Sequence, residues 1–129
     1  MSPETLLLVG LAVTVGLLLT ACWTGHKAKR KPHLVFVLLT VVALTLTVLQ
    51  AEYVGTLYDL EAAGIITPIH LNIAYVATGS FLLPIITGIM TWRNPAKKKL
   101  HRGCVLIAVT LTVASAITGA LMLTSAEPL

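Results

Sequence analysis

Three histidines give this chain its clearest capacity for chemistry. His33, His70 and His101 each stand where a long apolar stretch begins. A neutral imidazole carries one lone-pair nitrogen that can ligate a metal or haem iron, and its charge changes near neutral pH. No nucleophile and base can be placed together at one depth of the chain, so a stand-alone enzyme is not indicated. The histidines instead indicate electron-transfer or proton chemistry.

His33 and His101 form the candidate ligand pair. They begin the second and fourth apolar stretches, which run parallel to each other if every stretch spans a membrane, so both lie at the same predicted depth. Two imidazoles facing each other across a helix bundle can ligate haem b or another metal centre, and nearby Lys and Arg residues can neutralise the haem propionates. A second interpretation stays open, in which histidine is simply comfortable at a membrane interface.

His70 lies at the opposite predicted depth. Polar side chains are expected around it: Asn72, Tyr75, Gln50 and Glu52. Such a group can bind a quinone head group or relay a proton, which makes His70 a candidate cofactor-binding residue. The alternative is an ordinary helix start, with Thr67 as N-cap and Pro68 at the first helical position.

Two cysteines allow a further metal site. Cys22 and His26, together with His101 and Cys104, have a spacing that permits zinc or copper binding by two thiolates and two imidazoles. The alternative is that both cysteines are small buried apolar residues. A disulfide is not expected, because both lie near the predicted reducing side of the membrane.

The elements that must position these residues are apolar helices. Of the 129 residues, 57% are hydrophobic and only 11% are charged, which is too little polar surface for a soluble globule. A hydrocarbon core about 30 Å thick needs roughly 20 helical residues. Four stretches are that long: Thr5–Trp23, His33–Tyr53, Ile69–Trp92 and Leu100–Thr124. We predict an all-α protein, a single transmembrane domain over residues 1–129 built as a four-helix up-down bundle.

The charged residues predict the orientation of this bundle. The nine cations lie in or beside two loops: Lys27, Lys29, Arg30, Lys31, Arg93, Lys97, Lys98, Lys99 and Arg102. The five acids lie toward the other ends of the stretches: Glu4, Glu52, Asp59, Glu61 and Glu127. Because basic loops stay in the cytoplasm, we predict both termini on the outer, periplasmic side of a bacterial inner membrane. Topology then accounts for the +4 net charge, and nucleic-acid binding is not predicted.

Helical spacing indicates which way the histidines face. On the second stretch His33 heads a polar stripe with Thr40, Thr47 and Gln50, which should turn toward protein rather than lipid. On the fourth stretch His101 heads a row of small side chains: Cys104, Ala108, Thr112, Ser115 and Gly119. Such a row accommodates a neighbouring helix or the edge of a porphyrin. In addition, "ITG" follows both His70 and His101 after sixteen residues, which suggests an inverted internal repeat.

These features together resemble a known family. A His before the second helix, "IH" opening the third, a late Pro and Gly in the third, and "HR" opening a fourth helix that closes with "TG" resemble a bacterial four-helix membrane family of unknown function. Its members are associated with haem-copper terminal oxidases. The resemblance covers Lys31 to Leu123 and places His33, His70 and His101 on family histidines. A further family histidine is missing here, where the chain reads "LQAEYVGTLY", so an outer site involving His70 lacks a partner. A weaker similarity is to small b-type membrane cytochromes.

Two classes of function follow from the sequence. The first is a small integral membrane subunit of a respiratory or photosynthetic electron-transport complex, with a b-type haem or a quinone as cofactor. The second is a cofactor-free accessory or assembly subunit that packs against the transmembrane helices of partner subunits. In both classes the expected partners are membrane lipid and other transmembrane subunits.

Overall fold

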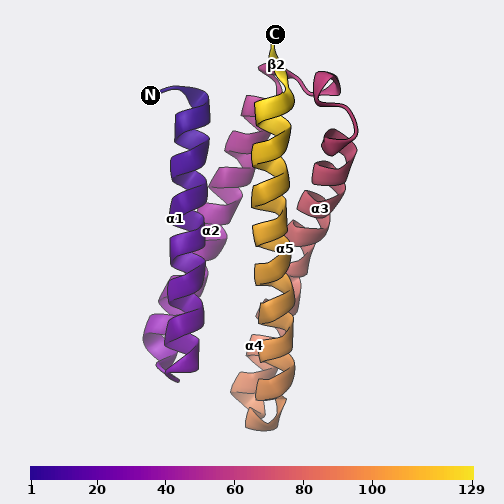
Figure 1. The fold of residues 1–129 in the computed structure, drawn as a ribbon. Coiled ribbons are helices and arrows are strands. Elements are labelled where there is room, and N and C mark those ends of the chain that lie inside the picture. The colour runs from indigo at the N-terminus through magenta and orange to yellow at the C-terminus, as the bar shows by residue number, and fades with distance from the viewer. The chain divides into compact units, whose positions relative to one another are not determined.

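The computed structural model describes all 129 residues and is almost entirely helical (Figure 1). Its helices are α1 (Pro3–His26), α2 (Arg30–Gly55), α3 (Ile66–Ser80), α4 (Leu82–Arg93) and α5 (Lys98–Ser125). The short elements are β1 (Tyr58–Asp59), η1 (Glu61–Ala63), η2 (Pro95–Lys97) and β2 (Glu127–Pro128).

Four helical segments are long and apolar enough to cross a membrane, as predicted. They are Pro3–His26, Arg30–Gly55, Ile66–Arg93 and Pro95–Ser125. Each begins earlier and ends later than the apolar stretch that predicted it. The extra turns carry charged and polar residues, whose long side chains can leave the apolar layer while the backbone stays helical. The chain is therefore a multi-pass membrane protein of four apolar helical spans.

The third span is broken, which the sequence analysis did not predict. α3 ends at Ser80 and α4 begins at Leu82. Pro84 has no N–H to donate to the carbonyl of Ser80, so the regular helical ladder cannot continue through this point. The N–H of Phe81 instead donates to the Thr78 carbonyl at 3.3 Å, a tighter turn than an α-helix makes.

The helices pack as two compact units. The first comprises Met1–Asp59 with Pro128–Leu129, and in it α1 packs against α2. The second comprises Leu60–Glu127, and in it α3 and α4 pack against α5. The end of the chain belongs to the first unit, because the Leu129 N–H donates to the Leu57 carbonyl at 3.0 Å.

The two units bury corresponding positions. In the first helix of each unit the buried pairs are 63 positions apart: Thr14 and Ala77, Leu18 and Phe81, and Thr24 and Thr87. In the second helix they are 68 positions apart: Thr40 and Ala108, and Val54 and Met122. These buried residues therefore recur at a constant spacing in the two units. Each unit is an antiparallel helix pair.

Threonine supplies most of the buried polar groups. Thr14, Thr40 and Thr112 each donate their hydroxyl hydrogen to the carbonyl four residues earlier in the same helix, at 2.6–2.8 Å. This local bond satisfies the hydroxyl without help from another helix. Across α1 and α2 the hydroxyls of Thr14 and Thr47 also lie 2.9 Å apart. No buried side-chain nitrogen or oxygen lacks a hydrogen-bond partner.

The two basic turns have different backbones. After α1, Ala28 adopts a left-handed conformation with φ of 55°. The Ala28 N–H donates to the Gly25 carbonyl and the Lys29 N–H to the Thr24 carbonyl, which is the Schellman arrangement of a helix end. Between α4 and α5 the Asn94 side chain accepts from the Ala96 N–H at 3.1 Å and starts η2 instead.

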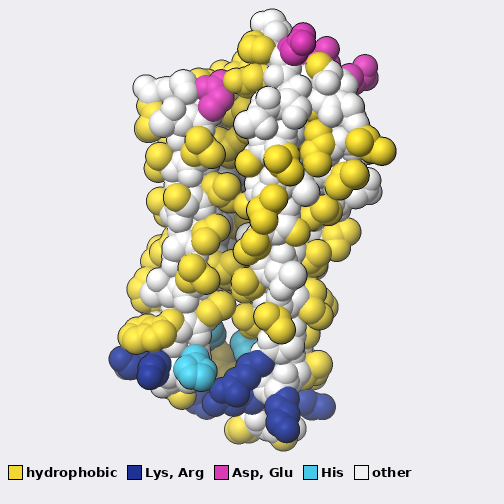
Figure 2. Space-filling model, in the orientation of Figure 1, with side chains coloured by type: hydrophobic (Ala, Val, Ile, Leu, Met, Phe, Trp, Pro, Cys, Tyr) yellow, Lys and Arg dark blue, Asp and Glu magenta, His cyan; other side chains and the backbone are white.

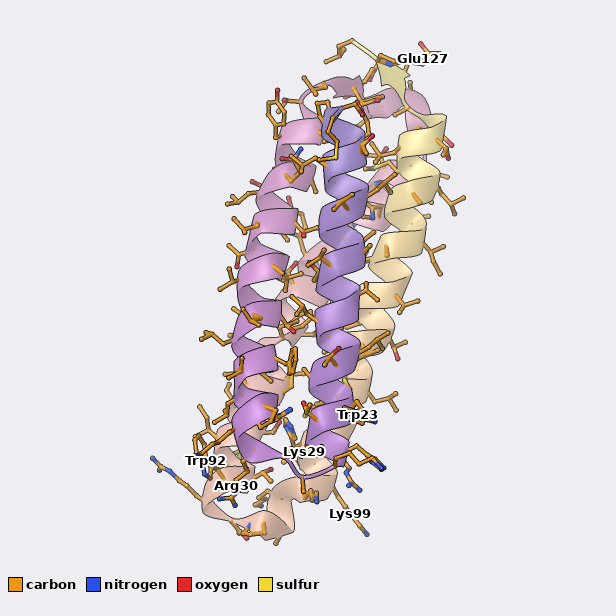
Figure 3. All side chains as sticks on the ribbon, turned by 90° about the vertical axis from the view of Figure 1, so that its left-hand side faces the viewer. Trp23, Lys29, Arg30, Trp92, Lys99 and Glu127 are labelled. Atoms are coloured by element: carbon orange, nitrogen blue, oxygen red, sulfur yellow. The ribbon has the colours of Figure 1, made fainter.

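In each unit the cations gather at one end and the acids at the other (Figure 2). The cations surround the α1–α2 turn in the first unit and the α4–α5 turn in the second. One tryptophan accompanies each turn: Trp23 lies near Lys29 (Figure 3), and Trp92 is the second-last residue of α4, just before the α4–α5 turn. Tryptophan is enriched at the membrane–water interface, so the basic end of each unit has the composition of an interfacial region.

Candidate histidine sites

His33 lies against α1. It sits in the first turn of α2, and its Nδ1–H donates to the backbone carbonyl of Ala21 at 2.8 Å. The Thr24 hydroxyl also lies 3.0 Å from this carbonyl. The ring rests on Gly25, where a Cβ would lie 2.9 Å from the imidazole Cε1. The polar stripe of α2 therefore faces protein, as predicted.

His101 makes the corresponding contact in the second unit. It lies in the first turn of α5 and faces α4, where its Nδ1 is 3.1 Å from the hydroxyl oxygen of Thr87. The ring rests on Gly88, with 3.3 Å between Cε1 and the position of a Cβ. Thr87 and Gly88 are the "TG" of the first "ITG" motif.

His70 makes the same contact in the reverse direction. From α3 its Nδ1 lies 3.0 Å from the hydroxyl oxygen of Thr118 on α5, and its ring rests on Gly119 at 2.9 Å from a Cβ position. Thr118 and Gly119 are the "TG" of the second "ITG" motif. Each histidine of the second unit thus contacts the motif that follows the other histidine. The echo in the sequence corresponds to a reciprocal pair of histidine contacts.

The hydrogen bond of His33 fixes its neutral tautomer, because the Ala21 carbonyl can only accept and Nδ1 must carry the hydrogen. At His101 and His70 the facing group is a threonine hydroxyl, which can donate or accept. The Thr87 and Thr118 hydroxyls also lie 2.7 Å and 2.9 Å from carbonyls of their own helices, those of Leu83 and Ala114. When each hydroxyl donates to its own helix, its oxygen accepts from the imidazole Nδ1–H, and Nε2 bears the lone pair.

Such an Nδ1 bond to the protein has a known chemical consequence. When a histidine ligates a metal through one ring nitrogen, the other usually donates to a carbonyl, carboxylate or water, which fixes the tautomer and the ring orientation. Here a carbonyl or a threonine oxygen fills that role at His33, His70 and His101. With Nδ1–H on the protein, each of these side chains can accept a hydrogen bond or donate electrons through Nε2.

The three predicted site residues are not all placed together. His70 and His101 both belong to the second unit but contact opposite ends of it, and His33 belongs to the first unit. The structure defines each imidazole by its own helix pair. No group of three or more His, Cys, Asp or Glu side chains is arranged to hold a metal ion, and Cys22 and Cys104 are free thiols.

The surroundings of His70 match neither the predicted polar group for a quinone or proton relay nor the predicted helix start capped by Thr67. The Asn72 amide donates to the Pro68 carbonyl of its own helix at 2.8 Å, and Tyr75 is 73% exposed, so neither turns to the imidazole. The prediction that Thr67 caps the helix is wrong. α3 begins at Ile66 without a side-chain cap, and the Thr67 hydroxyl donates to the Leu60 carbonyl of the preceding segment. The hydroxyl thus binds the incoming loop and does not start the helix.

The row of small side chains on α5 is filled by helix packing. Cys104, Ala108 and Thr112 are buried where α5 meets α3 and α4. Of the two interpretations left open for this row, a neighbouring helix is the one that the structure shows.

Residue type and spacing did not predict the partners of the histidines. Thr87 and Thr118 belong to the repeated "ITG" motif, which gives no sign that their hydroxyls face two imidazoles. The sequence also did not predict that the imidazoles lie against Gly25, Gly88 and Gly119, although two of these glycines belong to the repeated motif. The Ala21 carbonyl is a backbone group, which residue type does not reveal.

Comparison with protein-family models found no match, and searches of the curated proteins and of the solved structures found none either. The interpretation of the histidine sites therefore depends on their own geometry.

Proposed function

We propose that this chain is a small membrane subunit of an electron-transport complex in the bacterial inner membrane, with His33 and His101 as its candidate ligands for a haem b. The observation that carries the proposal is that Nδ1 of each imidazole contacts the protein, at the Ala21 carbonyl and at the Thr87 hydroxyl, which directs coordination to Nε2. A bound haem supplies one-electron redox chemistry. The chain's own residues would orient the imidazoles through the Ala21 carbonyl and the Thr87 hydroxyl.

The basic turns support the same proposal. His33 follows the cations of the α1–α2 turn, and His101 lies among those of the α4–α5 turn. Lys and Arg side chains at these positions can neutralise carboxylate groups at the interface. In the proposed orientation both turns face the cytoplasm and both termini lie outside, because cationic loops resist transfer across the inner membrane.

His70 has a separate role in this proposal. Its Nε2 also bears the lone pair, so it can accept a hydrogen bond from the hydroxyl of a quinol. The proposed haem does not use it.

An absorption spectrum of the full chain tests the haem. The protein would be produced in a bacterial host supplied with haem and purified in mild detergent, and we expect a Soret band that shifts on reduction with dithionite. His33→Ala and His101→Ala should each abolish the band. His70→Ala should keep it, and so should His26→Ala, which removes an exposed histidine close to the same turn. Absence of a Soret band would reject the haem, and a band that survives both key substitutions would reject His33 and His101 as its ligands.

A cofactor-free accessory subunit is the second candidate, and the glycine contacts favour it. Each imidazole covers a glycine on the facing helix, so the rings contribute to packing even without a ligand. Large apolar side chains point outward along all four spans, and these can contact the helices of other subunits. Co-purification of intact electron-transport subunits with a colourless protein would support this candidate. Isolation as a lone chain from native membranes would count against both candidates.

A further inference from the structure

The turn between α1 and α2 concentrates positive charge without any acid. Lys27, Lys29, Arg30 and Lys31 fall within five consecutive positions, and all four side chains are exposed. The negative end of the α1 dipole and the positive end of the α2 dipole meet at this turn and offset each other. The four cationic side chains therefore set the attraction of the turn for anions.

One of these cations is held at a tryptophan. The Nζ of Lys29 lies 5.3 Å from the centroid of the Trp23 ring, within the range of a cation–π interaction. Trp23 itself is 54% exposed. An indole of this kind prefers the depth of lipid head groups. The contact therefore places the ammonium group at that depth, beside the start of the apolar surface.

The surface next to the turn is apolar. Leu19 lies one turn before Trp23 on α1, and Leu34 and Val35 follow the cations on α2, all with exposed side chains. A ligand that contacts both parts of this surface must combine a negative head with an apolar tail. An anionic phospholipid has that chemistry, whereas free phosphate and nucleic acid have no use for the apolar flank.

We propose that the α1–α2 turn binds an anionic phospholipid, with its phosphate at Lys29 and Arg30 and its acyl chains along the exposed side chains of α1 and α2. This goes beyond the proposed function and does not depend on it. The α4–α5 turn is a natural comparison. It carries at least as many cations, but none lies over Trp92. General attraction to a negative membrane is common to both turns, and the tryptophan-held lysine belongs to the first alone.

Tryptophan fluorescence can report the site directly, because the chain has two tryptophans and one lies at each turn. In the Trp92→Phe background, Trp23 is the sole reporter. The full chain would be reconstituted in phosphatidylcholine vesicles that contain a minor fraction of brominated phosphatidylglycerol or, in parallel, of brominated phosphatidylcholine. We expect Trp23 to be quenched more by the brominated anionic lipid at equal mole fraction.

Two paired variants distinguish a site from general charge. Lys29→Gln with Arg30→Gln should lower the relative affinity for phosphatidylglycerol by roughly tenfold. Lys98→Gln with Lys99→Gln removes the same charge from the other turn and should leave Trp23 quenching unchanged. The preference of the parent protein should also fall as salt is raised.

Three outcomes would overturn the proposal. The first is equal quenching by the two brominated lipids. The second is an equal effect of the two paired variants, which would show that only net charge matters. The third is loss of the preference when inorganic phosphate is added at constant ionic strength, which would identify a site for free phosphate.

Discussion

Each helix pair has one end that carries the acidic residues, and the two units make different side-chain contacts at this acidic end. In the second unit this end holds the contact between His70 and Thr118. In the first unit the corresponding positions are Leu7 and Gln50, and the Gln50 amide donates to the Pro3 carbonyl at 3.2 Å instead. One unit thus closes with an imidazole and a hydroxyl, and the other with an amide and a backbone carbonyl.

The basic ends, in contrast, are alike. His33 and His101 occupy corresponding positions, 68 residues apart, and both rings rest on the glycine of a "TG" pair. Only the acceptor of the Nδ1–H differs, a carbonyl in one unit and a threonine hydroxyl in the other. The first helix pair therefore packs without a contact like that of His70, whereas both helix pairs have a histidine contact at the basic end. This shared contact is the one on which the proposed function depends.

Substitution of the glycines should break the contacts with the largest effect. A Cβ at Gly25 or Gly119 would lie 2.9 Å from an imidazole carbon, so Gly25→Ala and Gly119→Ala must each displace a ring and its hydrogen bond. We expect a loss of about 2–3 kcal/mol in the free energy of unfolding, measured by denaturant titration in detergent. Gly88→Ala should cost less, because the corresponding distance is 3.3 Å.

Gly16 and Gly79 provide matched controls. Each lies within a helix, and nothing lies within 4 Å of a Cβ placed there. Gly16→Ala and Gly79→Ala should therefore stabilise their helices, by up to about 1 kcal/mol. If the two classes of glycine gave equal effects, the contacts between imidazoles and glycines would carry no energy.

Threonine substitutions should separate the two kinds of acceptor. Thr87→Val removes the hydroxyl oxygen that faces the His101 Nδ1 and should lower the free energy of unfolding by about 1–2 kcal/mol. Thr24→Val, at the corresponding position, should not disturb His33, because that imidazole donates to a carbonyl. Nitrogen chemical shifts of the imidazoles would report each tautomer. Thr87→Ser should restore the His101 signal, and an altered His33 signal in Thr24→Val would contradict the assignment.

The two turns should respond oppositely to glycine. Ala28 has a left-handed backbone, so Ala28→Gly relieves strain and should stabilise the first unit by about 1 kcal/mol. Ala96 lies in η2 with ordinary backbone angles, so Ala96→Gly should be neutral or slightly destabilising. Unfolding midpoints of the two variants in the same detergent provide the measurement. Equal shifts would argue against the left-handed turn.

The smallest effect concerns a contact that only the first unit has. The Tyr58 hydroxyl donates to the Glu4 carboxylate at 2.9 Å, and this hydrogen bond raises the pKa of Tyr58. Since the folded pKa exceeds the unfolded one, the contact stabilises the protein below the ordinary tyrosine pKa near 10 and is lost as the pH rises through the raised value. Ultraviolet titration should show the Tyr58 phenol ionising above the ordinary tyrosine pKa. Glu4→Gln should remove most of this delay.

Much of the fold follows from residue type and spacing. Four apolar runs predicted four helices, and the steps of seven and three among His33, Thr40, Thr47 and Gln50 predicted the face of α2 that packs on α1. Periodicity is informative here because the face of a helix toward lipid must be apolar, whereas the face toward protein can carry polar side chains. The break at Phe81 was missed, because a single Pro84 can kink, break or merely bend a membrane helix depending on its neighbours.

The candidate site was predictable only in part. Residue type identified the histidines, and the repeated "ITG" marked two of the places that they contact. His70 contacts the "ITG" motif that follows His101, and His101 contacts the motif that follows His70. This exchange results from the antiparallel packing of the helices, which a repeated three-residue motif does not specify. The acceptor at Ala21 is a backbone carbonyl near the end of α1, and residue type does not show which carbonyl an imidazole will reach.

The threonine hydroxyls that bind their own helices bear on the order of assembly. A helix with this internal bonding can enter the bilayer alone, because its hydroxyls need no neighbour before insertion. The imidazoles are different, since each Nδ1–H finds its acceptor only after a second helix arrives. His33, His70 and His101 all lie in the first turns of spans, where water and head groups can serve them in the meantime. Biogenesis can thus proceed in two stages, insertion first and pairing second, with the histidines among the last polar groups to leave water.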